Sequence, residues 1–172
     1  MENPMKSIRI AKVTLNMGTG KSMDLLDKAV NLMKNLVGIT PVKCVTNKRI
    51  AAWGLRPGLP IGCKLTLRGK KAEETLKRFL YAKDNMLMPS SFDDRGNISF
   101  GVPEYIDVKD AKYDPKLGIM GMQVSITLER PGYSIKKRKI RPSKLSKKHI
   151  ISKTDAMEFM KTNFGINIQE NE

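Results

Sequence analysis

Alternating apolar and polar positions predict a β-sheet with one covered face and one open face. The longest alternating run is residues 119–130, where the apolar positions are Met120, Met122, Val124, Ile126 and Leu128. Residues 7–16 and 61–67 alternate in the same way, and a slip of one residue near Ala11 and Lys12 predicts a bulge. Residues 42–46, 97–100 and 105–108 predict shorter strands. Because the polar positions share one face, we expect helices to cover the opposite face.

Three segments carry apolar residues at helical spacing, at residues 23–37, 71–82 and 153–163. Ser22 and Gly38 are the predicted caps of the first helix, and Ser152 and Asp155 have the spacing of a capping box before the third. We predict a single α+β domain, mainly an antiparallel sheet with helices packed on one face, plus a basic extended arm and a C-terminal helix. Residues 1–129 form the predicted core and residues 130–150 the arm, with few anchors and ordered on a partner. Residues 151–172 form a helix and tail on or near the core.

The charge of the chain is large and unevenly distributed. The formal net charge is +15, with ten basic and no acidic residues in residues 28–72, and nine basic and no acidic residues in residues 130–149. Residues 73–129 between them are slightly acidic. Two basic blocks around a near-neutral middle indicate one side that faces a polyanion, with nucleic acid as the first candidate partner. A uniformly basic surface is the alternative.

A membrane partner is disfavoured by the sequence. No segment approaches the ~20 apolar residues of a spanning helix, and the first ten residues, MENPMKSIRI, lack the apolar core of a signal peptide. We therefore expect a cytosolic protein without a membrane partner.

The residues needed for catalysis or metal binding are scarce. Cys44 and Cys63 are far apart, and His149 is the single histidine. We expect no enzyme activity, no cofactor, no metal site and no catalytic residue.

One alternative is a P-loop-type nucleotide hydrolase built on residues 18–22, because Gly20, Lys21 and Ser22 stand where a strand meets a helix. The phosphate-binding loop requires G-x-x-x-x-G-K-[ST], and Leu15 occupies the position of the first glycine. Lys21 and the backbone N–H groups at the helix start still offer a seat for an RNA phosphate.

Residues 46–69 predict a basic projection, a glycine- and proline-rich loop between two predicted strands. Polar and basic side chains at the strand ends predict a patch that binds phosphate and sugar: Asn16, Thr46, Asn47, Lys48 and Arg49. Lys64 and Arg68 point outward from the second strand of the projection. Because surface aromatics are scarce, the chemistry favours recognition of the shape of folded RNA over stacking on single-stranded bases.

Five motifs carry a resemblance to a known family. They are residues 13–20 (VTLNMGTG), 46–49 (TNKR), 56–69 (RPGLPIGCKLTLRG), 91–97 (SFDDRGN) and 118–122 (GIMGM). With these motifs, the sequence resembles the large-subunit ribosomal proteins that bind 5S rRNA (ribosomal protein family L-five), in the archaeal and eukaryotic branch. The basic arm and last helix look like the archaeal form. At residues 19–22 the chain departs from the family, which often has a small residue and an acid there.

The resemblance implies a structural protein of the cytoplasmic ribosome that attaches 5S rRNA to the large rRNA in the central protuberance. The positions that match the family's 5S-facing residues are Asn16, Met17, Gly18, Thr46, Asn47, Lys48 and Arg49. The positions that match its loop toward the P-site tRNA are Gly54, Leu55, Arg56, Pro57, Gly58, Leu59 and Pro60, with Arg56 as the best single contact. Neighbouring ribosomal proteins are further implied partners, and residues 107–116 resemble the segment that faces the small subunit.

Overall fold

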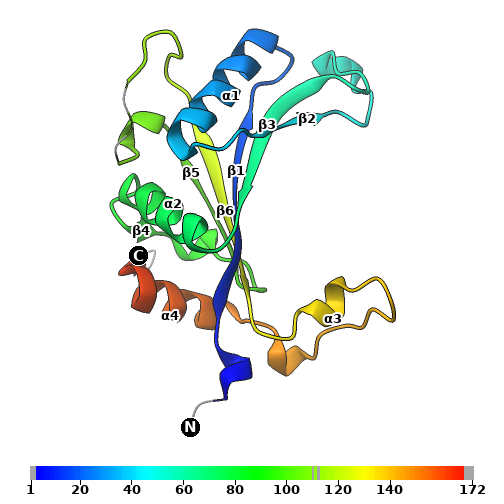
Figure 1. Cartoon of the computed structure of the whole chain (residues 1–172), viewed down its shortest axis with the longest axis vertical. Coiled ribbons are helices and arrows are strands. Elements are labelled where there is room, and N and C mark those ends of the chain that lie inside the picture. The colour runs from blue at the N-terminus through cyan, green and yellow to red at the C-terminus, as the bar shows by residue number, and fades with distance from the viewer. Residues whose placement is uncertain (1–2, 110, 112, 169–172) are drawn as a thin grey trace.

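A five-stranded antiparallel sheet forms the centre of the protein, with the strand order β2-β3-β1-β6-β5 (Figure 1). The computed structural model describes residues 3–109, 111 and 113–168. The strands are β1 (Arg9–Gly18), β2 (Val42–Val45), β3 (Pro60–Leu67), β5 (Asn97–Val102) and β6 (Met122–Glu129). A separate pair of short parallel strands joins β4 (Met86–Leu87) to β7 (Asn167–Ile168).

Three helices cover one side of this sheet: α1 (Met23–Val37), α2 (Lys70–Tyr81) and α4 (Lys153–Phe164) (Figure 1). The short helix α3 (Ser134–Lys137) and the β2–β3 hairpin project on the other side. Short 3-10 turns are η1 (Pro4–Lys6), η2 (Ala51–Trp53), η3 (Pro89–Ser91), η4 (Tyr105–Asp107) and η5 (Lys147–His149). The predicted α+β architecture is confirmed. No helix within the described residues combines the length and the apolarity needed to cross a bilayer.

Local sequence signals set the helix ends as predicted. The Ser22 hydroxyl accepts a hydrogen bond from the backbone N–H of Leu25, and Gly38 ends α1 in the left-handed conformation. Both hydrogen bonds of the capping box between Ser152 and Asp155 are present at the start of α4.

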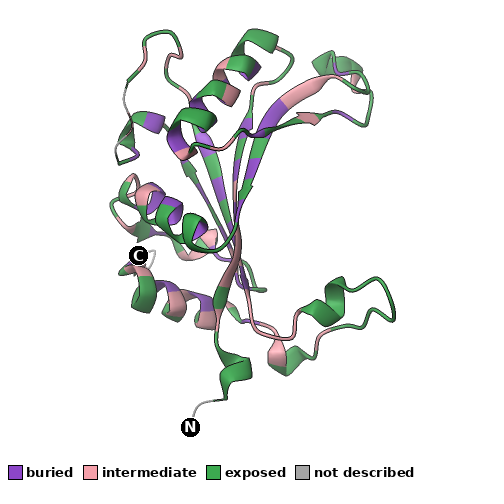
Figure 2. Ribbon diagram, viewed as in Figure 1, coloured by how far each residue is buried: buried purple, intermediate pink, exposed green. Residues whose placement is uncertain are grey.

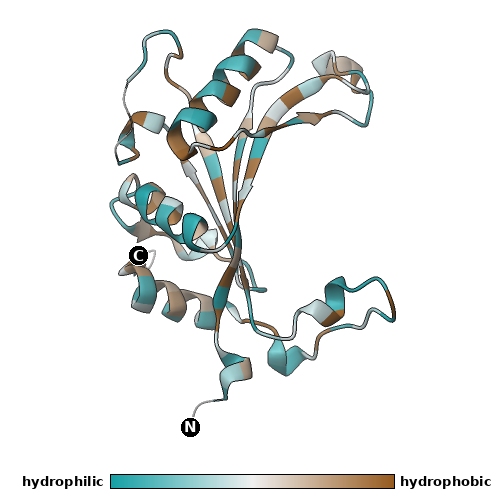
Figure 3. Ribbon diagram, in the orientation of Figure 1, coloured by the Kyte–Doolittle hydropathy of each residue, from teal (hydrophilic) through white to brown (hydrophobic). Residues whose placement is uncertain are grey.

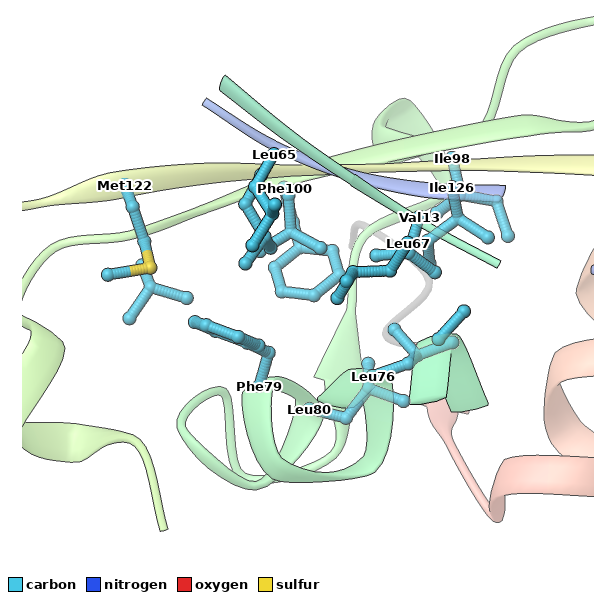
Figure 4. Close-up of a cluster of buried hydrophobic side chains, with 14 of the residues drawn as sticks. Val13, Leu65, Leu67, Leu76, Phe79, Leu80, Ile98, Phe100, Met122 and Ile126 are labelled. Atoms are coloured by element: carbon cyan, nitrogen blue, oxygen red, sulfur yellow. The ribbon is translucent and has the colours of Figure 1, made fainter. Parts of the chain in front are cut away.

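The core lies between the sheet and the helices. The side chains of Val13 and Leu15 in β1 are fully buried, as are Val124 and Ile126 in β6. Figure 4 shows Leu76, Phe79 and Leu80 of α2 pointing toward apolar side chains of the strands. Burial of these alternating rows fixes the strand register, because a slip of one residue would turn each row toward water.

The opposite face of the sheet carries polar side chains that are exposed or half-buried. Along the strands these positions alternate with buried ones (Figure 2). Thr14 pairs with Thr66 on one side and with Ser125 on the other, and Ser125 pairs in turn with Ser99. Four hydroxyl groups therefore form a row across four strands. This open face offers many short hydrogen-bonding side chains to a partner.

The predicted bulge is confirmed between Ile10 and Lys12. Two strand predictions differ from the structure by more than two residues at an end. Residues 105–108 form the turn η4 (Tyr105–Asp107) and its extended C-cap Val108 instead of a strand. Tyr105 is fully buried, and its hydroxyl accepts a hydrogen bond from the backbone of Asp114 at 3.1 Å. β6 begins at Met122, because the backbone N–H of Tyr105 donates to the Met120 carbonyl and residues 119–121 serve this connection.

Residues 130–150, the arm, project from the body and are anchored at both ends. Arg130 forms an ion pair with Asp155 of α4 at 2.8 Å. The Tyr133 hydroxyl accepts from the backbone of Ile151, and His149 Nε2 lies 2.8 Å from the Pro131 carbonyl oxygen. These contacts join the arm to itself and to α4. The sequence predicts few anchors because such contacts produce no periodic pattern of residues. Residues 169–172 of the predicted tail lie outside the described residues.

Candidate nucleic-acid interface

The base of the β2–β3 hairpin is closed by Thr46. Its backbone N–H and its hydroxyl both donate to the Leu59 carbonyl at 2.9 Å, and its own carbonyl accepts from Gly58 at 2.8 Å. The residue is 8% exposed. The sequence predicts that Thr46 binds RNA through its hydroxyl; the hydroxyl proton is used inside the hairpin, and the oxygen keeps its lone pairs to accept a hydrogen bond.

The next turn, between Arg56 and Leu59, follows from the local sequence. The Leu59 N–H donates to the Arg56 carbonyl at 3.1 Å, and Pro57 and Gly58 occupy the two central positions. Gly58 has φ +83°, as the third residue of a type II turn requires. Pro57 and Gly58 are exposed, whereas Leu59 and Pro60 are half-buried.

The tip of the hairpin is a compact loop. Ile50 and Leu55 exchange two backbone hydrogen bonds of 3.0 and 3.1 Å, and these bonds enclose the turn η2. Gly54 ends this turn with φ +67°. Leu55 is buried, whereas Arg56 beside the tip is exposed. Arg56 is therefore the longest exposed side chain among the predicted loop residues.

Positive charge surrounds this projection. Lys48, Arg49 and Arg56 are exposed and form no ion pair within the described residues. Lys21 joins them from the β1–α1 connection, because a methyl carbon added to Gly54 would lie 3.9 Å from Lys21 Nζ. We call the following residues the hairpin surface: Lys21, Asn47, Lys48, Arg49, Trp53 and Arg56.

Sequence reasoning does not assign Lys21 and Trp53 to this surface. The sequence indicates Lys21 only as a possible phosphate-binding residue at the start of α1. Its position close to Gly54 depends on tertiary structure. Trp53 is 69% exposed at the tip. A large exposed aromatic side chain beside cations is suited to stacking on a base. A tryptophan close to basic residues in the sequence is the signal that could have assigned Trp53 to this surface.

The end of β1 lies close to the base of the hairpin. Gly62 of β3 pairs with Gly18 on one side and with Cys44 of β2 on the other, so Gly18 and Cys44 are about 10 Å apart. The backbone of Thr19 also donates to the Ile61 carbonyl at 3.0 Å. The two groups of residues predicted to face RNA therefore lie at one corner of the sheet.

The three predicted residues of β1 differ in what they present. Asn16 is exposed, and its amide donates to Gln123 at 3.4 Å. Met17 is 3% exposed and packs in the core, so it offers backbone alone at this corner. Gly18 is exposed at the edge of a cavity of about 590 Å³ where β1 and β6 diverge.

Lys64 and Arg68 lie on the open face of the sheet. Lys64 stands opposite Asn16 in the β1–β3 ladder, and Arg68 directly follows the last residue of β3. Both side chains are exposed. They extend the positive surface from the hairpin across the row of hydroxyl groups.

The cysteines do not form a reactive site. Burial, with a smaller contribution from Cys44, raises the pKa of the Cys63 thiol to about 11. Cys63 Sγ lies 3.9 Å from the sulfur of Met33 in the core. This thiol remains protonated near neutral pH and acts as a small apolar side chain.

The structural setting of residues 18–22 does not support the nucleotide hydrolase. A P-loop follows a strand of a mainly parallel sheet, whereas β1 is antiparallel to both of its neighbours. Leu15, where the first glycine is needed, is fully buried in the core, and the Ser22 hydroxyl caps α1.

Comparison with known protein families identifies the family of this chain. The chain matches the family described as Ribosomal protein L5 over residues 3–56, and the model of the C-terminus of the same ribosomal family over residues 60–159. The chain belongs to the ribosomal protein L5 family. The predicted family, rRNA binding and location on cytoplasmic ribosomes are thereby confirmed. Members of the L5 family are structural ribosomal proteins, and nothing in the match indicates catalysis.

Archaeal L5 proteins are similar over nearly the whole chain. Large ribosomal subunit protein uL5 of Nanoarchaeum equitans is 48% identical over 169 residues, which cover 98% of this chain and 99% of the relative. The protein of the same description from Sulfurisphaera tokodaii is 45% identical over 169 residues, covering 98% and 96%. That from Methanococcus aeolicus is 44% identical over 172 residues, covering 98% and 95%.

Proposed function

We propose that this protein is a structural component of the large ribosomal subunit that binds 5S rRNA and helps attach it to the large rRNA in the central protuberance. The observation that carries the proposal is the hairpin surface, where exposed cations without ion-pair partners among the described residues surround a rigid projection. The relatives described as large ribosomal subunit proteins support the assignment to that subunit.

The base of the hairpin and the open face of the sheet supply the chemistry of binding. Lys48 and Arg49 bind phosphates and release counterions, which supplies affinity without base specificity. Asn16 and the row of hydroxyl groups on the open face supply hydrogen bonds to ribose 2′-OH groups, as recognition of folded RNA requires. Lys64 and Arg68 add charge along the same face.

The tip of the hairpin has a separate role in this proposal, as a contact to the P-site tRNA. Gly54 and Leu55 close the tip, and Arg56 and Trp53 are the side chains that it presents. The remaining implied partners are neighbouring ribosomal proteins and, through residues 107–116, the small subunit. Residues 110 and 112 of that segment lie outside the described residues.

Selective binding to 5S rRNA tests the main proposal. The full chain is expected to shift 5S rRNA at concentrations at least about tenfold below those needed for a generic duplex RNA of equal length. The reason is that recognition of the shape of 5S rRNA adds to the affinity that phosphate contacts supply for any RNA. The measurement is a gel-shift titration at physiological salt. Equal affinities for the two RNAs would overturn the assignment to 5S rRNA.

Replacement of the tip tests the contact to tRNA. Residues 51–54 are replaced by Asn-Gly, a two-residue turn that keeps the strands in register, and Arg56 is replaced by Gln. Both changes leave the Thr46–Leu59 hydrogen bonds intact. We expect 5S rRNA affinity within about threefold of the parent and weaker retention of P-site tRNA on reconstituted ribosomes. Unchanged tRNA retention would exclude the contact, and a collapse of 5S binding would assign the tip to 5S rRNA instead.

A further inference from the structure

A second basic site lies at the other end of the open face. A cleft of about 770 Å³ separates the arm from the turn before β5 and the last residues of β6. Its volume lies within the range of about 300–1,000 Å³ typical of ligand sites. We call it the arm cleft, and the lining residues that matter here are Arg95, Tyr133, Lys136, Lys137, Lys144 and Leu145. The arm and the hairpin project on the same side of the sheet, at opposite ends (Figure 1).

The charge of the arm cleft is not neutralised within the described part of the protein. Arg95, Lys136 and Lys144 are exposed, and no ion pair joins them to any described residue. The arm itself carries nine basic and no acidic residues in residues 130–149, and its ribbon is mainly in hydrophilic colours (Figure 3). Three free cations around one opening form a site for an anion.

The carboxylate that lines the arm cleft is already occupied. Glu129 accepts from Lys137 at 2.8 Å and from Arg9 at 3.0 Å, and its side chain is 14% exposed. The hydrogen bond from Lys137 holds the pKa of Glu129 below its ordinary value, so the group stays ionised and paired near neutral pH. It therefore leaves the three free cations uncompensated.

The arm cleft is held open by contacts within the protein. Beyond the anchors at its two ends, the arm closes on itself where Ser143 N–H donates to the Ile135 carbonyl at 3.3 Å. Arg138 Nε donates to the Arg141 carbonyl at 2.8 Å, which holds Arg141 at φ +49°, a conformation rare for residues other than glycine. A site formed before binding lowers the entropic cost of association.

The floor of the arm cleft differs from its rim. Leu128 is buried, and Leu145 and Ile150 are half-buried in the lining, whereas the free cations stand at the edge. The Tyr133 hydroxyl is engaged with the backbone of Ile151. An RNA strand matches this arrangement, because its sugars can cover apolar surface while its regularly spaced phosphates meet the cations.

We infer that the arm cleft is a second RNA-binding site, which holds a single RNA strand by its phosphates independently of the hairpin surface. The inference rests on the proposed function in requiring that the protein works on rRNA. It assigns a different set of residues, so the two can fail separately. An acidic protein segment is the competing occupant, and the test below separates it from RNA.

The probe is a 12-nucleotide oligouridylate that carries one 4-thiouridine for photo-crosslinking to the full chain. We expect crosslinks within residues 133–150 and about tenfold weaker formation of these crosslinks in the triple variant Arg95→Gln, Lys136→Gln, Lys144→Gln. Loss of three contacts to single-stranded RNA should also reduce the slope of log K against log salt concentration by about 2. The matched control removes equal charge from exposed positions of α1, α2 and α4: Lys34→Gln, Lys77→Gln and Lys161→Gln.

The arm cleft is supported if the control retains the crosslinks and if the hairpin variant Lys48→Gln, Arg49→Gln, Lys64→Gln retains them too. Unchanged crosslinking in the cleft variant, or equal loss in the control, would overturn the inference. Displacement of the oligouridylate by a lower concentration of 12-residue polyglutamate would overturn it in favour of an acidic protein segment. Loss of 5S rRNA binding in the hairpin variant tests the proposed function separately.

Discussion

Replacing Lys48, Arg49 and Lys64 together with glutamine is expected to lower the affinity for 5S rRNA by about 10²–10³ at physiological salt. Each of these side chains is exposed and lacks an ion-pair partner among the described residues, so the substitution removes contacts to RNA and leaves the fold unchanged. A charge-assisted hydrogen bond contributes about 1.5–3 kcal/mol, and three bonds at the lower end correspond to about three decades. The measurement is a filter-binding titration at several salt concentrations.

The salt dependence distinguishes a site from a general effect of charge. Three lost phosphate contacts should reduce the slope of log K against log salt concentration by about 3 on duplex regions of 5S rRNA. The same control as for the arm cleft, Lys34→Gln, Lys77→Gln and Lys161→Gln, removes equal charge from the helical side. Equal losses in the two variants would favour a uniformly basic surface and contradict the assignment to the hairpin.

Features fixed by neighbouring residues could be predicted from the sequence. The bulge in β1 is visible as a change in the phase of alternation, and the caps of α1 and α4 as residue types at fixed spacing. The type II turn at Pro57 and Gly58 follows from the φ values that these two residues prefer. In each case the physical cause lies within a few residues of the effect.

The side chains that the interface offers could not be predicted in the same way. Thr46 is a polar residue predicted to bind RNA, and its hydroxyl proton is donated to the carbonyl of Leu59, 13 residues later in the chain. Met17 lies in a motif that matches the family, yet its side chain belongs to the core. Lys21 reaches the hairpin tip only because β1 and β3 are paired. Such contacts between distant residues leave no periodic signal in a single sequence.

The corner that joins β1 to the hairpin has little tolerance for added volume. A methyl carbon on Gly62 would lie 2.5 Å from the Met17 carbonyl oxygen and 3.3 Å from the Gly18 Cα. Both contacts are to backbone, so a side-chain rotation cannot relieve them. β1 cannot simply move away, because the Met17 side chain on the same residue is packed in the core.

Gly62→Ala is therefore expected to lower the free energy of unfolding by about 3 kcal/mol, at the upper end of the cost of overpacking. For a chain of this size, that loss corresponds to a fall in Tm of about 6–12 °C. Gly18→Ala is the matched control, since Gly18 pairs with Gly62 in the same ladder and no atom lies within 4 Å of the added carbon. We expect the control to stay within about 0.5 kcal/mol of the parent. Thermal unfolding followed by circular dichroism measures both variants, and equal Tm values would show that β1 and β3 can separate at this corner without cost.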